Sequence, residues 1–272
     1  MHPTRSRSES TGRRAGVDWL SVSFLLGALL CCYYLLPVVA LVVAQPPGVV
    51  LARLGDPTVV SAAATSLVAA LASATLAAVF GLPLAYWLAR AEGRARTLVT
   101  ALVVLPLVLP PIVSGMVLLT VVGPTTLLGS LAAANGVPLT RSLAGVVLAQ
   151  TFVASPFVVV TATAAFEGVD PRLEAASRSL GKRRLTTVRR VTLPLAWPGV
   201  LAGVTLAFAR SMGEFGATVM LAYYPRTMPV QIWVSFTTLG LDAAFPVAVV
   251  LVGVAVVTLV VLDRLGTTPW GR

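Results

Sequence analysis

Residues 62–89, AAATSLVAALASATLAAVFGLPLAYWLA, contain no charged side chain. A helix rises about 1.5 Å per residue, so a run of this length can cross the ~30 Å hydrocarbon core of a bilayer. The run lacks the alternation of a membrane β-strand, and a helix satisfies its own backbone hydrogen bonds in lipid. These residues predict a membrane-spanning helix.

The rest of the chain repeats this pattern. Of its 272 residues 57% are hydrophobic and 11% are charged, whereas soluble domains carry about 25% charged residues. The uncharged run that starts at Trp19 is longer than the roughly 7–15 residues of a signal-peptide core, so we expect a retained first span. The sequence predicts an all-α, polytopic membrane helix bundle of about six transmembrane helices, near residues 21–43, 62–89, 98–122, 143–166, 199–221 and 243–262.

The region 97–140 is uncharged throughout and has room for two spans. Pro106, Pro110 and Pro111 interrupt it. We predict one proline-bent span, followed by an external loop with a short helix or re-entrant piece.

The basic residues test this topology. With six spans and a cytoplasmic N-terminus, sixteen of the twenty lysines and arginines fall in inside segments, and only Arg53, Arg141 and Arg226 fall outside. This asymmetry follows the positive-inside rule, so we predict both termini in the cytoplasm. We divide the chain into a cytoplasmic basic tail, 1–18, and a transmembrane domain, 19–265. The dispersal of the charges argues against nucleic-acid binding.

The chain carries no recognisable reaction chemistry. His2 is its single histidine, and Cys31 and Cys32 are adjacent within an apolar run. A P-loop, which needs Gly, four residues and then Gly-Lys-Ser/Thr, is absent from the sequence. We predict no catalytic residue, no metal site and no cofactor on this chain.

The longest polar segment between spans is 167–198. Asp170-Pro171 is a typical helix start, Leu173, Ala176 and Leu180 share one face, and Gly181 is placed to end the helix. This cytoplasmic amphipathic helix either docks into a groove on a soluble partner or lies on anionic lipid headgroups.

This loop resembles a known motif. Ala175-Ala176-Ser177, three residues, Gly181, nine residues and Val191-Thr192-Leu193-Pro194 match the spacing of the coupling motif of binding-protein-dependent ABC importer permeases, Glu-Ala-Ala, three residues, Gly, nine residues, Ile-x-Leu-Pro. Ala175 replaces the usual glutamate, with Glu174 one residue earlier, and Ser177 replaces the second alanine. The resemblance implies a type I ABC importer transmembrane fold. It assigns ATPase coupling to Asp170, Leu173, Glu174, Ala175, Ala176, Ser177, Leu180, Gly181, Leu193 and Pro194.

The resemblance also implies partners. A second copy of the chain would complete the permease in a prokaryotic cell membrane, surrounded by lipid. Two ABC ATPase subunits would hold ATP and magnesium and receive the coupling helices. An external substrate-binding protein would deliver the cargo.

Two charges fall inside the fifth predicted span. Arg210 and Glu214, at i and i+4, share one helix face and can neutralise each other, while Gly213 and Gly216 allow a second helix to approach. The two charged residues either form a salt-bridged packing pair or lie on a face that borders the translocation path or its gate. Residues 209–218, 150–156 and 223–229 resemble the molybdate/tungstate permease group, whose sulfate relatives are close. The candidate residues of the path or gate are Thr151, Ser155, Arg210, Gly213, Glu214, Gly216 and Thr218.

Other functions are open at this point. The nearest alternative is an ABC importer permease that carries sulfate or another solute. An ATP-independent secondary carrier needs intramembrane coupling groups, for which Arg210 and Glu214 are the only charged candidates. A membrane anchor that transports nothing needs no docking loop.

Overall fold

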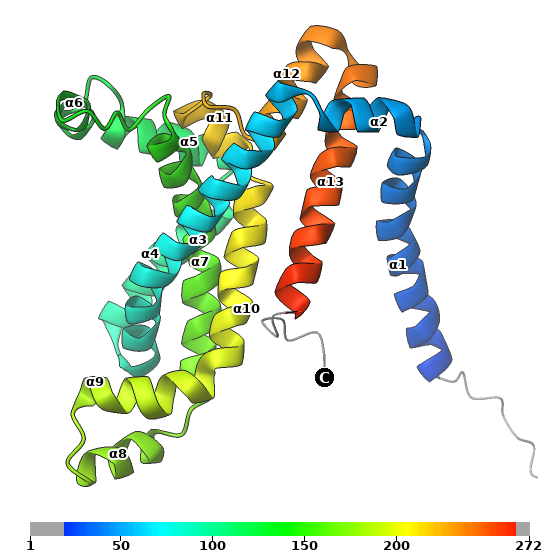
Figure 1. Cartoon of the computed structure of the whole chain (residues 1–272). Coiled ribbons are helices and arrows are strands. Elements are labelled where there is room, and N and C mark those ends of the chain that lie inside the picture. Colours follow the sequence, from blue (N-terminus) through cyan, green and yellow to red (C-terminus); the bar gives the residue numbers. More distant parts are fainter. Residues whose placement is uncertain (1–18, 265–272) are drawn as a thin grey trace, which may run out of the picture. The chain divides into compact units, whose positions relative to one another are not determined.

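The computed structural model describes residues 19–264, and within them every regular element is a helix (Figure 1). The tail predicted over 1–18 and the last residue of the predicted domain, 265, lie outside this range. The first helix, α1 (Trp19–Val43), forms a compact unit by itself. Its 25 residues confirm a first apolar helix long enough to span a membrane.

The second unit begins at Pro46. Its described helices are α2 (Pro47–Leu54), α3 (Pro57–Arg90), α4 (Arg94–Val108), α5 (Pro111–Val122), α6 (Leu127–Ala134), α7 (Leu143–Glu167), α8 (Pro171–Ser179), α9 (Arg184–Thr187), the π-helical turn η1 (Val188–Thr192), α10 (Leu193–Met212), α11 (Gly216–Leu221), α12 (Met228–Leu239) and α13 (Leu241–Arg264). The predicted spans at 62–89, 143–166 and 243–262 are confirmed by α3, α7 and α13.

The core lies where α3, α7 and α10 pack side by side (Figure 1). Small side chains bring these helices together, because membrane helices associate through close backbone packing rather than through exclusion of water. Ala85, Ala162 and Val200, one from each helix, are buried in a common cluster. A Cβ on Gly199 of α10 would lie 2.6 Å from the Cβ of Ala165 of α7.

The predicted span at 98–122 is broken into two helices. The axes of α4 and α5 differ by 118°, a much sharper change than the bend we expected. Pro110 precedes α5 and Pro111 occupies its first turn, where a proline ring fits without the loss of a helical hydrogen bond. The short helix predicted beyond this span is α6.

The broken pair nevertheless connects opposite ends of the bundle. Arg96 of α4 pairs with Glu167 at the end of α7. The chain beyond α5 meets the other end, where the backbone N–H of Arg141, just before α7, donates to the carbonyl of Leu221. The pair therefore counts as one interrupted crossing. With the five long apolar helices it gives the six predicted spans.

The fifth span differs from its predicted bounds. Instead of 199–221, one apolar helical stretch runs from Arg184 through η1 to Met212 and ends there. The next helix, α11, begins at Gly216. Gly213 and Glu214 therefore lie in a break and not on a helix face. The carboxylate Oε1 of Glu214 accepts a 2.7 Å hydrogen bond from the Ala217 N–H, which satisfies a donor at the start of α11.

Gly216 is where α11 meets α5. A Cβ on Gly216 would lie 2.7 Å from the Cβ of Pro111 and 2.9 Å from the backbone nitrogen of Ile112. A Cβ on Gly213 would meet only the carbonyl of Ala209, at 3.9 Å. The close approach that we predicted for both glycines therefore occurs at Gly216 alone.

We predict that Gly216→Ala destabilises the protein by about 1–3 kcal/mol, because overpacking forces two backbones apart. The matched variant is Gly213→Ala, which adds the same methyl group where there is room for it. Thermal unfolding in detergent micelles should show a lower midpoint for Gly216→Ala alone. Equal midpoints for the two variants would contradict the close packing of α5 on α11.

Candidate functional site

The predicted amphipathic helix is α8, and both of its ends are capped as the sequence suggests. A carboxylate oxygen of Asp170 accepts a 2.8 Å hydrogen bond from the backbone N–H of Arg172. At the other end the Gly181 N–H donates to the Arg178 carbonyl and the Lys182 N–H to the Ser177 carbonyl, the two bonds of a Schellman motif. Gly181 has φ +76° and ends the helix, as predicted.

Much of α8 faces away from the rest of the chain. Ala175 and Ala176 are exposed, and Leu173 is 46% exposed. Leu180 and Leu185, which flank the turn between α8 and α9, are 78% and 72% exposed. We call these two leucines the apolar tip. Of the other predicted coupling residues, Leu193 packs against the core and Pro194 is exposed at the start of α10.

Glu174 points the other way, into the protein. It is 7% exposed. Its carboxylate accepts hydrogen bonds from Arg90 Nη2 at 2.8 Å, from Thr192 Oγ1 at 2.9 Å and from Tyr86 Oη at 3.2 Å. Burial alone would raise the pKa of Glu174, but the hydrogen bonds from Arg90 and Thr192 outweigh it and hold the pKa below its ordinary value. Glu174 is therefore a charged internal anchor of α8.

The partners of Glu174 were not identified from the sequence. Arg90 and Tyr86 are 84 and 88 residues away along the chain. In the sequence Arg90 is simply the first charge after an apolar run, and Thr192 fills the variable position of the coupling motif. A second polar contact, Ser177 to Thr187 at 3.0 Å between hydroxyl oxygens, joins α8 to α9.

The second candidate site surrounds Arg210 and Glu214. Arg210 Nη2 lies 2.6 Å from Glu214 Oε2, so the predicted pair is present although only Arg210 is in a helix. The Glu214 side chain is 1% exposed and that of Arg210 is 28% exposed. The pair is thus a buried carboxylate held by a partly accessible guanidinium.

The other predicted path residues divide between two helices. Thr151 and Ser155 lie on α7, and Thr218 is fully buried on α11, which packs against α7. Among the described residues, the hydroxyls of Thr151 and Thr218 have no hydrogen-bond partner. Neither Thr151 nor Ser155 forms a hydrogen bond with Arg210 or Glu214 in the structure.

Comparison with known proteins identifies the family to which this chain belongs. Residues 81–266 match the family described as the binding-protein-dependent transport system inner membrane component. The chain belongs to this family. The probable molybdenum ABC transporter permease protein of Haloferax volcanii is 61% identical over 264 residues, 97% of each chain. The molybdate/tungstate transport system permease protein of Pyrococcus abyssi is 34% identical over 87% of this chain and 91% of its own.

Solved structures give the same fold. A chain of a bacterial alginate ABC transporter, solved in complex with an alginate pentasaccharide-bound periplasmic protein, superposes with a TM-score of 0.66. The match covers 92% of this chain and 96% of that one at 17% identity. The chain is therefore an inner membrane component with the transmembrane fold of ABC importers.

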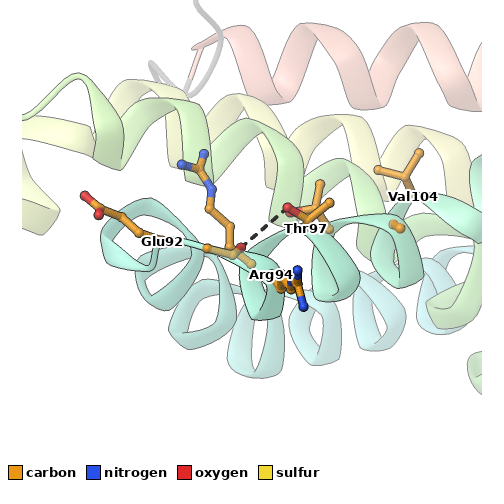
Figure 2. A pocket seen from close by; sticks show the side chains of 8 residues that line it. Glu92, Arg94, Thr97 and Val104 are labelled. Carbon is orange, nitrogen blue, oxygen red and sulfur yellow. Dashed lines mark hydrogen bonds between the residues drawn. The ribbon is translucent and has the colours of Figure 1, made fainter.

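A cavity of about 890 Å³ lies beside the first turns of α4 of this inner membrane component (Figure 2). Figure 2 shows Glu92, Arg94 and Thr97 among the lining side chains and Val104 farther along the helix. The Thr97 hydroxyl donates to the Gly93 carbonyl at 3.5 Å. The lining residues come from α4 and the turn before it, and they include none of the predicted coupling or path residues.

Proposed function

We propose that this chain forms the translocation path of an ATP-driven importer for a small tetrahedral oxyanion, with molybdate or tungstate as the cargo. The observation that carries the coupling role is α8, a capped helix at one end of the bundle, together with the exposed apolar tip that follows it. The relatives support the cargo, since the Haloferax protein, a probable molybdenum permease, matches almost the whole chain.

The proposed machine contains two copies of this chain. Each α8 docks into a groove on one of two ATPase subunits, which bind ATP and magnesium. Closure of the ATPase pair moves both α8 helices and opens the path toward an external binding protein that delivers the oxyanion. A closed pair of ATPases offers two equivalent grooves, and a C2 dimer of this chain offers two equivalent helices.

Reconstitution tests this function. Proteoliposomes that contain the chain with its ATPase should accumulate molybdate or tungstate only when ATP and the loaded binding protein are both supplied. Preferential uptake of sulfate would contradict the proposed cargo but leave the proposal of an ATP-driven importer intact. Uptake driven by an ion gradient without the ATPase would contradict the proposal and favour a secondary carrier.

We propose that the end carrying α8 and α9 faces the cytoplasm, because seven of the basic residues lie between 167 and 198. The prediction is tested with exposed single cysteines, Ser179→Cys in α8 and Thr125→Cys before α6, in a chain lacking Cys31 and Cys32. An impermeant thiol reagent applied to intact cells should label only Thr125→Cys. Labelling of both positions, or of Ser179→Cys alone, would contradict this orientation.

We predict that Gly181→Val uncouples ATP hydrolysis from uptake. Apart from Gly181 and its two chain neighbours, no residue has an atom within 4 Å of a Cβ at Gly181, so the variant is not blocked sterically. A β-branched residue at φ +76° is strained by about 1–2 kcal/mol and would displace the helix end. Gly181→Asn is the matched control, since asparagine tolerates this conformation. Uptake per ATP hydrolysed should fall in the valine variant alone, and equal coupling in both would contradict the role of this cap.

A further inference from the structure

A buried carboxylate, that of Glu174, attaches the coupling helix to two helices of the transmembrane core. Glu174 lies in the first turn of α8 and bonds to two other elements. Arg90 and Tyr86 are in the last turns of α3, and Thr192 ends the π-helical turn that directly precedes α10. A displacement of α8 therefore acts directly on the ends of two spans.

The partners of Glu174 extend this connection to the third core helix. The ring of Tyr86 packs edge-on against Phe166 of α7, with centroids 5.7 Å apart and an interplanar angle of 89°. Arg90 also donates to the carbonyl of Val169, beyond α7, at 3.4 Å. Phe166 is 2% exposed, so this contact belongs to the packed core. The ends of α3, α7 and α10 thus meet around Glu174.

Apart from Glu174, no residue of α8 is buried. A cavity of about 550 Å³ separates part of its first turn from α7 and α10; its lining includes Leu173 on one side and Leu195 and Gly199 on the other. The free space there means that apolar packing does not fix the position of the helix. The contacts of Glu174 do so instead, together with those that α8 makes with α9.

The π-helical turn explains how Thr192 reaches the carboxylate. The last residue of η1 is Thr192, which is fully buried, whereas Arg189 and Arg190 of the same turn are exposed. Short π-helical turns within α-helices recur at functional sites, where they redirect a side chain. Here the turn places a hydroxyl 2.9 Å from the Glu174 carboxylate.

We propose that Glu174 is the positioning residue that makes α8, α3 and α10 move as one unit, so that ATPase closure is converted into movement of the spans. The inference rests on the proposed docking of α8 to an ATPase. It separates two roles within the loop that contains α8 and α9: the apolar tip binds the partner, and Glu174 transmits the motion. A buried carboxylate with three donors suits transmission, because separating it from them leaves an unpaired buried charge.

The test compares Glu174→Gln with a matched variant, Glu167→Gln. Glu167 also forms an ion pair at this end of the bundle, with Arg96, but both side chains of that pair are more than 40% exposed. Exposed pairs contribute little, so Glu167→Gln should change uptake by less than about twofold. Glu174→Gln should keep ATPase copurification within about twofold of the unmodified chain while lowering uptake per ATP hydrolysed by roughly tenfold, a size typical of a lost coupling contact. In complexes that contain this variant, ATP hydrolysis by the ATPase should also no longer be stimulated by the loaded binding protein.

A distance measurement separates this role from a general loss of folding. Spin labels at the exposed positions Ser179 of α8 and Glu92, just beyond α3, should keep one narrow distance through the ATP cycle in the unmodified chain. In Glu174→Gln the distribution should broaden. Unchanged coupling, an unchanged distribution, or loss of ATPase copurification in Glu174→Gln would each overturn the proposal. Failure of the unmodified chain to copurify with an ATPase would instead refute the proposed function.

Discussion

Arg210→Met is expected to destabilise the protein by about 3–5 kcal/mol, because it leaves the Glu214 carboxylate buried without its cation. That carboxylate is 1% exposed, and its one other partner among residues 19–264 is the Ala217 N–H. Glu214→Gln should cost less, since an amide oxygen can still accept that bond. The Arg210→Met/Glu214→Gln double variant should be more stable than Arg210→Met, because the isolated charge is gone.

The measurement is a double-mutant cycle on denaturant unfolding in detergent micelles. Arg53→Met is the control, since Arg53 and Asp56 form a 3.1 Å pair with side chains 33% and 26% exposed. Asp56 keeps its bond from the Thr58 N–H, so the control should cost less than about 1 kcal/mol. Strict additivity of the Arg210 and Glu214 changes would show that the two charges do not stabilise each other.

The spans were predictable because lipid imposes one simple demand, a long uncharged helix. Residues 62–89 and 143–166 meet it, and both lie inside single helices of the structure. The ends of α8 were predictable for a different reason. The caps at Asp170 and Gly181 are local interactions that residues close in sequence make with one another, so the residue types alone indicate them.

The breaks in the spans were harder to predict. Proline bends a helix or starts a new one, and the sequence near Pro110 does not say by how much the direction changes. At Glu214 the spacing correctly predicted the ion pair with Arg210 but wrongly predicted a continuous helix. The side chain caps α11 instead, a role that depends on where the preceding helix ends.

The anchor at Glu174 could not be predicted from a single sequence. Its partners come from the ends of α3 and the start of α10, and nothing in the order of the residues connects these places. The motif indicated that Glu174 belongs to the coupling helix, and the structure turns its side chain away from the exposed face. The sequence motif suggested that Glu174 contacts a partner protein, but its carboxylate bonds to residues of the same chain.

Leu180→Asp is expected to weaken ATPase association by at least roughly thirtyfold. Burying a leucine in a partner groove contributes about 2 kcal/mol, and an aspartate there adds the desolvation of a charge. Leu180 is 78% exposed in this chain, so the change should leave the fold intact. Leu127→Asp is the control, because Leu127 is 74% exposed on α6, at the opposite end of the bundle from α8 (Figure 1).

The measurement is copurification and titration of the ATPase against each detergent-solubilised variant, with thermal unfolding as the check on folding. The alternative role for α8 is a helix on anionic lipid headgroups, where Leu180 would insert into the membrane surface. In that case Leu180→Asp would leave ATPase binding unchanged. Unchanged ATPase binding in Leu185→Asp as well would exclude the apolar tip as the docking surface, since the tip consists of these two leucines.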